Sequence, residues 1–243
     1  MSGGDRRCAG LAPSARSRGS GMGPARFRIA RAPLAQAMLS VLTAALILLA
    51  AGSVQAGNQR LEPLSAAVRS ALAAAVVDRS PPQPRFASAF EASDWIAEMS
   101  SRLPVRHKPT AFERTEFLQM VRYEAQRAGL DPHLVLGLIQ VESGFRRHAI
   151  SSAGARGYMQ VMPFWTEQIG DGDASRLFDA RTNLRYGCVI LRHYLDRENG
   201  DLFRALGRYN GSLGRPEYPR AVLAAWKRWT YTSIAPVQVA ARP

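Results

Sequence analysis

From Thr110 to about residue 229 the chain repeats one pattern, an amphipathic segment bounded by a capping residue and followed by a short polar turn. Thr110 can cap a helix that runs to about Ala128, and Asp131-Pro132 opens the next helix with the acid at the N-cap. Further helices are predicted at about 163–169, 181–197, 201–209 and 216–229. No alternating apolar and polar stretch is long enough for a sheet. The fold class is therefore predicted as mainly α, with a loop-rich middle at residues 144–161.

The chain before Thr110 is predicted to be a separate, short helical region. Residues 57–80 form an alanine-rich helical stretch, and residues 80–84 are a proline-rich break. Residues 90–103 form a helix with Ser93 as its N-cap and with Trp95, Met99 and Leu103 toward the core. On the next helix the predicted apolar side is Phe112, Phe117, Val121 and Ala125.

The N-terminus predicts export. Residues 37–51 are an uncharged apolar run that is too short to span a bilayer comfortably. Three arginines (Arg26, Arg28 and Arg31) precede the run, and Val54-Gln55-Ala56 follows it as a small-x-small cleavage site. We therefore expect residues 1–56 to be a signal peptide, with Met22 as an alternative start. An uncleaved N-terminal anchor is the competing interpretation.

The net charge and the cysteine content indicate which kinds of partner and site the protein has. The leader holds seven of the 32 basic and one of the 19 acidic residues, so the net charge falls from +13 to +7 on its removal. An exported basic protein is expected to meet envelope polyanions and not nucleic acid, although a merely solvated basic surface has the same composition. Cys188 is the one cysteine after the leader and is predicted to be a buried structural thiol. No Cys/His cluster has metal spacing, so no metal or cofactor is expected.

One acid lies on an apolar helix. Val135, Leu138, Ile139 and Glu142 fall at i, i+3, i+4 and i+7, so they share a face. Burial and the negative end of the helix, which Gly144 is expected to stop, both favour the neutral acid. A glutamate that stays protonated near neutral pH is suited to general acid catalysis. The alternative is a glutamate in the last turn that points to water.

The loop after Glu142 is rich in groups that bind sugars. Its glycines allow backbone to approach a ligand, and Ser151, Tyr158 and Gln160 add polar side chains. Tyr209, Asn210 and Tyr218 combine aromatic faces with an amide or a hydroxyl. These features describe a carbohydrate cleft. Most glycosidases use two carboxylates, and Asp171, Asp173 and Asp179 are candidate partners that their spacing does not separate.

Four ordered motifs resemble the catalytic domain of soluble lytic transglycosylases. The first is Glu142-Ser143-Gly144-Phe145, and the second runs from Ala149 through Gly157-Tyr158-Met159-Gln160 to Pro163. The third is Asn183-Leu184 with Gly187, and the fourth is Tyr209-Asn210, followed by Tyr218 before Val222. The resemblance covers about residues 111–230. Tyr158 stands where the family usually has leucine, and Arg208 and Gly211 flank Tyr209-Asn210 where alanine is usual.

The resemblance implies a lysozyme-like helical domain that cleaves the MurNAc–GlcNAc β-1,4 bond of peptidoglycan and forms a 1,6-anhydro ring. Glu142 would be the single acid and base. Substrate-binding positions would be Ser151, Tyr158, Gln160, Met162, Tyr209, Asn210 and Tyr218. For Tyr158 a core position is the alternative. The implied activity is that of a lyase that needs no cofactor.

The expected organisation is a leader (1–56), a helical and linker region (57–110), a catalytic domain (111–232) and a tail (233–243). We expect a periplasmic or envelope-associated monomer whose substrate is peptidoglycan glycan strands, with cell-envelope machinery as a candidate partner. A hydrolytic muramidase and a non-catalytic cell-wall-binding module are the alternative functions.

Overall fold

A computed structural model describes residues 59–77, 82–108 and 110–232 of the chain. In this part of the chain the α-helices are α2 (Ala66–Val77), α3 (Ala89–Arg102), α4 (Ala111–Arg127), α5 (Pro132–Glu142), α6 (Phe164–Ile169), α7 (Ala180–Arg197), α8 (Leu202–Asn210) and α9 (Glu217–Trp229). Two 3-10 helices, η1 (Val105–His107) and η2 (Ala174–Phe178), join them. Within the same residues the only β-type pairings are two isolated bridges, Ile150 to Arg156 and Arg156 to Val161. The prediction of a mainly α fold is confirmed.

The expected leader and the tail from residue 233 lie outside the described residues. Within the described residues, no helix has the length and apolar character to cross a bilayer.

Most helix ends follow from the predicted caps. The Thr110 side chain accepts a hydrogen bond from the Glu113 backbone N–H, and the Glu113 side chain accepts one from the Thr110 backbone N–H. Together these two bonds form a capping box at the start of α4. Asp131 caps α5 as predicted. The helix predicted at residues 90–103 begins at Ala89, but the prediction of Ser93 as its cap is wrong, because the cap is Ser88, which accepts from the Glu91 N–H. Ser93 lies inside α3 and donates to the Phe90 carbonyl.

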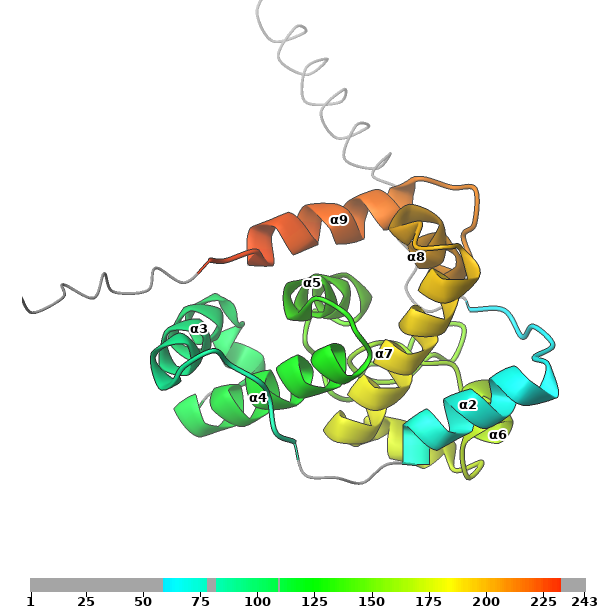
Figure 1. The fold of residues 1–243 in the computed structure, drawn as a ribbon, viewed down its shortest axis with the longest axis horizontal. Coiled ribbons are helices and arrows are strands. Elements are labelled where there is room, and N and C mark those ends of the chain that lie inside the picture. The colour runs from blue at the N-terminus through cyan, green and yellow to red at the C-terminus, as the bar shows by residue number, and fades with distance from the viewer. Residues whose placement is uncertain (1–58, 78–81, 109, 233–243) are drawn as a thin grey trace, which may run out of the picture. The chain divides into compact units, whose positions relative to one another are not determined.

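The core is built around α5, whose residues from Leu134 to Ile139 are all buried. Figure 1 shows α5 below α9 and above α4, and α5 contacts both helices. Trp95, Met99 and Leu103 of the preceding segment join this core, as predicted. Phe112, however, is 74% exposed. Phe117, Val121 and Ala125 follow one another at steps of four residues, whereas Phe112 lies five residues before Phe117 and so faces about 140° away.

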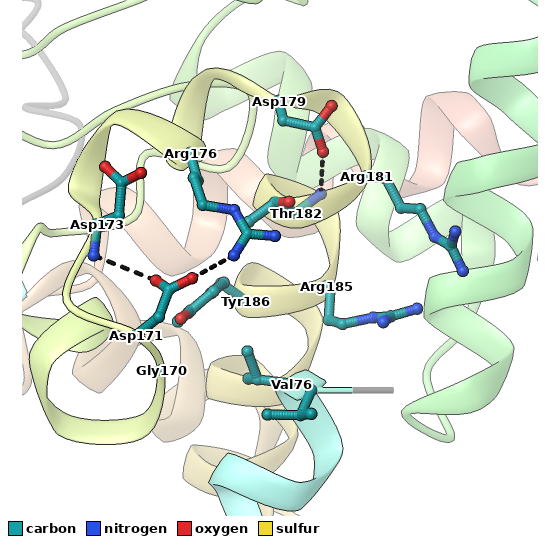
Figure 2. A pocket seen from close by; sticks show the side chains of 11 residues that line it. Val76, Gly170, Asp171, Asp173, Arg176, Asp179, Arg181, Thr182, Arg185 and Tyr186 are labelled. Atoms are coloured by element: carbon teal, nitrogen blue, oxygen red, sulfur yellow. Dashed lines mark hydrogen bonds and ion pairs between the residues drawn. The ribbon is translucent and has the colours of Figure 1, made fainter. Parts of the chain in front are cut away.

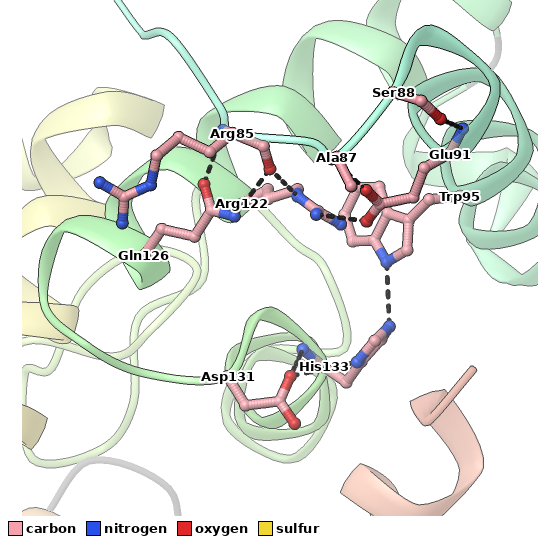
Figure 3. A network of polar contacts seen from close by, with 9 residues as sticks. All are labelled: Arg85, Ala87, Ser88, Glu91, Trp95, Arg122, Gln126, Asp131 and His133. Atoms are coloured by element: carbon pink, nitrogen blue, oxygen red, sulfur yellow. Dashed lines mark hydrogen bonds and ion pairs between the residues drawn. The ribbon is translucent and has the colours of Figure 1, made fainter. Parts of the chain in front are cut away.

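Polar contacts fix α5 to the segment that precedes α4 (Figure 3). Arg122 of α4 donates to the Arg85 carbonyl and to Glu91 of α3, over 2.9 and 2.7 Å. Trp95 of α3 donates from Nε1 to Nε2 of His133, which faces the cap residue Asp131 from its other ring nitrogen. Hydrogen bonds from His133 hold the pKa of Asp131 below its ordinary value, against the opposing effect of burial. The N-terminal end of α5 is therefore held from the α3 side.

Helix α2 packs against α6 and α7. Arg127 of α4 also donates two hydrogen bonds to the Ala75 carbonyl near the end of α2. The alanine-rich stretch is thus part of the folded unit. Cys188 of α7 is buried as predicted, and burial raises the pKa of its thiol well above the usual range.

Candidate active site

Glu142 is the last residue of α5 and is 4% exposed. Its position on the buried face confirms the periodicity argument. The helix stops where predicted: Ser143 is the C-cap, and Gly144 and Phe145 both take positive φ, at 57° and 67°. Phe145 pays a steric cost for this conformation, because it has a side chain. The sharp turn leads the chain directly from the acid into the loop.

Helix α9 brings a tyrosine to the acid. Tyr218, in the first turn of α9, donates a 2.5 Å hydrogen bond from its hydroxyl to Glu142 Oε1. The two helices approach closely at Gly137, where a Cβ atom would lie 2.6 Å from the Trp226 backbone nitrogen. Burial and the negative charge of Glu142 raise the pKa of Tyr218 well above its ordinary value. Tyr218 therefore remains a protonated donor across the neutral range.

Tyr209 and Asn210 end α8 beside this pair. Tyr209 is fully buried and donates from its hydroxyl to the Met159 carbonyl over 2.7 Å. Burial raises its pKa well above 10, and the charge of Glu142 adds to the effect, so the tyrosine lies in the field of the acid. Asn210 is buried, and Gly211 ends the helix in the left-handed conformation, which a glycine adopts without strain.

Buried side chains hold the loop between Glu142 and α6. Ser143 Oγ donates to the Tyr158 carbonyl over 2.8 Å. Gln160 has a positive φ of 49° and donates from Nε2 to the carbonyls of Ala149 and Gly157. Gln160 therefore shapes the loop whatever else it binds.

Asn183 of α7 makes three hydrogen bonds to the same loop region. Its Nδ2 donates to the Arg156 and Leu177 carbonyls, and its Oδ1 accepts from the Met159 N–H. Gly187, one turn further along α7, leaves room for Met159, whose Sδ would be 2.4 Å from a Cβ there. The sequence places Asn183 in a motif, but it does not reveal that the side chain binds loop backbone.

The remaining predicted site residues lie in different surroundings. Ser151 is half-buried and accepts from the Ala155 N–H in a tight turn. Met162 is half-buried at the end of the loop. Tyr158 is 1% exposed, with its ring 4.8 Å from that of Phe117, and its hydroxyl accepts a hydrogen bond from Lys108. Burial raises the pKa of Tyr158 to about 12. A role for these three in binding sugar remains a prediction.

One further residue lies at this site without any signal in the sequence. Gln59, before α2, is 4% exposed and accepts hydrogen bonds at Oε1 from Trp165 Nε1 and, more weakly, from the Met162 N–H. It lies in no periodic segment, so only the folded structure reveals it.

The three candidate partner acids stabilise a turn. Asp173 accepts from Ser175, and Asp179 caps α7 through the Thr182 N–H. Asp171 accepts from the Asp173 N–H and pairs with Arg176. Figure 2 shows all three around a cavity of about 390 Å³, which they share with Tyr186 and with Val76 of α2. Glu142 is not among the residues that line this cavity.

Comparison with known proteins identifies the fold around Glu142. The sequence model of a protein family, the transglycosylase SLT domain, matches residues 119–221. This stretch begins within α4 and ends within α9. Over this stretch the chain is similar to transglycosylase SLT domains. This stretch contains Glu142, Tyr209 and Tyr218, and it confirms the family that the motifs suggested.

Curated proteins are similar to part of this chain. The membrane-bound lytic murein transglycosylase C of Haemophilus influenzae (strain PittEE) is 33% identical over 114 residues, which are 41% of this chain and 32% of that protein. The transglycosylase of Enterobacteria phage PRD1 is 37% identical over 89 residues, 37% of this chain and 32% of the phage protein. A transglycosylase C of Actinobacillus pleuropneumoniae serotype 5b (strain L20) is 48% identical over 84 residues, 31% of this chain and 23% of its own length. The chain thus spans a third or less of each of these relatives.

Proposed function

We propose that this chain is a peptidoglycan lytic transglycosylase, which cleaves the MurNAc–GlcNAc β-1,4 bond and leaves a 1,6-anhydro-MurNAc end. The observation that carries the proposal is the buried Glu142, which receives the Tyr218 hydroxyl hydrogen bond inside an SLT domain. Relatives that match part of this chain are named lytic murein transglycosylases, which supports murein as the substrate.

The proposed reaction uses one carboxyl group twice. Glu142, as the neutral acid, gives its proton to the glycosidic oxygen while the bond from that oxygen to the muramic acid C1 breaks. The C6 hydroxyl of the same sugar then attacks C1 and gives its proton to the Glu142 carboxylate. This closes the anhydro ring and regenerates the acid without consuming water. No second carboxylate is needed, since the nucleophile belongs to the substrate.

Tyr218 is suited to assist both halves of this cycle. Its hydroxyl donates to Oε1 of Glu142, so it holds the carboxyl group in one orientation and stabilises the carboxylate once the proton has left. Ser151, Tyr158, Gln160, Met162, Tyr209 and Asn210 are the proposed substrate-binding residues. We further propose that the protein is exported and acts at the cell envelope, in keeping with the name membrane-bound that its relatives carry.

Product analysis on purified sacculi tests the proposal. The wild type is expected to release muropeptides that are one water lighter than hydrolysis products, and Glu142→Gln is expected to release none. Glu116→Gln, an exposed glutamate on α4, is the matched control and should keep full activity. Hydrated products would instead identify a muramidase. Activity that survives Glu142→Gln would refute the assignment, and an inactive wild type that still binds sacculi would indicate a binding module.

A further inference from the structure

Gln59 places a carboxamide beside residues of the proposed site. Its Oε1 accepts a 2.9 Å hydrogen bond from the Trp165 indole and a 3.4 Å bond from the Met162 N–H. The side chain also lies near enough to the Tyr209 hydroxyl to lower the pKa of that group, against the larger rise from burial. Met162 and Tyr209 are both proposed substrate-binding residues. A segment that precedes the matched domain thus fills space next to two of them.

The surroundings of Gln59 suit its carbonyl better than its amino group. Two N–H donors converge on Oε1, whereas Nε2 is buried and makes no well-formed hydrogen bond, even with the nearby Tyr209 hydroxyl. A buried N–H without a well-formed hydrogen bond is unfavourable. A carbonyl flanked by an apolar group would satisfy the same donors without that penalty, and the acetamido groups of peptidoglycan sugars have this form. The carboxamide is therefore an imperfect occupant of an amide-binding position.

The rest of the segment is held by the packing of Leu64 against the core and by a few polar contacts of Glu62. Glu62 pairs with Arg197 at the end of α7 and with Arg208 of α8, and its carbonyl accepts a 3.4 Å bond from Gln168. These ion pairs are partly exposed, and exposed pairs contribute little to stability. Helix α2 follows the segment directly and packs on α6 and α7. It therefore keeps the segment near the site even when the contacts of Gln59 and Glu62 are broken.

We propose that residues 59–64 form an intramolecular strap, and that the Gln59 carboxamide competes with an amide group of the substrate for the position between Trp165, Met162 and Tyr209. Substrate binds only after it displaces the strap, so the apparent affinity falls by the fraction of molecules in which the strap is open. The identity of the substrate in this inference rests on the proposed function. The strap itself rests on the contacts of Gln59 and Glu62.

Binding of tetra-N-acetylchitotetraose, measured by calorimetry in a Glu142→Gln background, tests the strap without turnover. Adding Gln59→Ala is expected to tighten binding about two- to tenfold, the factor that one net hydrogen bond represents. Glu62→Ala, which leaves Gln59 in place, should give a smaller gain. The control Gln83→Ala, at an exposed glutamine, should leave binding unchanged. Equal or weaker binding by Gln59→Ala overturns the proposal, and so does a failure of all forms to bind the tetrasaccharide.

Kinetics on sacculi provide a second measurement. With Glu142 intact, Gln59→Ala should lower KM by the same factor and leave kcat unchanged. The substitution removes only the population of free enzyme in which the strap occupies the site. A raised KM would mean that Gln59 is a wall of the site that helps to hold substrate, and it would refute the strap. Failure of the proposed function is seen separately, as hydrated products or as activity that persists in Glu142→Gln.

Discussion

Replacing Tyr218 with phenylalanine tests how the acid is controlled. The change removes the one oxygen that makes the 2.5 Å bond to Glu142 Oε1 and keeps the buried ring. A hydrogen bond to a charged group contributes about 1.5–3 kcal/mol, against about 1 kcal/mol for a neutral pair. The Glu142 carboxylate therefore loses about 0.5–2 kcal/mol more than the neutral acid does. At 1.36 kcal/mol per pH unit, the loss corresponds to a shift of about one unit.

The assay is the pH dependence of kcat/KM on solubilised glycan strands. We expect the alkaline limb, where Glu142 loses its proton, to move about one unit upward in Tyr218→Phe. We also expect kcat to fall about tenfold, because the carboxylate that forms as Glu142 gives up its proton in the first step loses the same stabilisation. Tyr123→Phe on α4 is the matched control. If the activity fell while the alkaline limb stayed in place or moved downward, Tyr218 would have only a packing role and the reasoning would be wrong.

Three further changes have expected outcomes. Gly137→Ala would place a Cβ 2.6 Å from the Trp226 backbone nitrogen, so α5 and α9 must separate and urea unfolding should show a loss of about 1–3 kcal/mol. Asn183→Ala would leave three backbone groups without their partner and should cost about 3–5 kcal/mol in the same measurement, whereas no loss would mean that water replaces the amide. The buried tyrosines Tyr209 and Tyr218 have pKa values raised well above 10, so their contribution to stability is complete below about pH 10, the pKa of an unfolded tyrosine, and is lost as pH rises further. Alkaline unfolding followed by circular dichroism should accordingly be less steep in Tyr209→Phe, and an unchanged slope would contradict the role of burial.

Helix positions were predictable because caps and periodicity are local. Asp131, Pro132 and Gly144 are enough to place α5, and the structure moves its end by no more than a residue or two. The two wrong predictions, for Phe112 and Ser93, both concern the first turn of a helix. Phe112 was assigned to the wrong face, and Ser93 was chosen over Ser88, although Ser88 with Glu91 forms the spacing of a capping box.

Contacts within the site were predictable only in part. The apolar face of α5 was sufficient to indicate that Glu142 is buried, and motif resemblance singled out Tyr218, but neither gave the hydrogen bond between them. Gln59 could not be foreseen, since it lies 106 positions before its partner Trp165 and carries no pattern. For Tyr158 the sequence left sugar binding and a core position open, and the fold buries the ring against Phe117.

The position of Glu142 depends on residues outside the stretch that matches the SLT domain. Trp226 and Trp229 lie beyond residue 221, yet their indoles donate to Asp131 and Gln140 at 2.9 and 2.7 Å and so fix both ends of α5 against α9. On the other side, Trp95 lies before residue 119 and donates to His133 in the first turn of α5. Three tryptophans from flanking segments thus hold the helix that carries the acid. Because the 2.5 Å contact of Tyr218 with Glu142 requires α5 and α9 to keep one register, these flanking tryptophans support the site from outside the matched stretch.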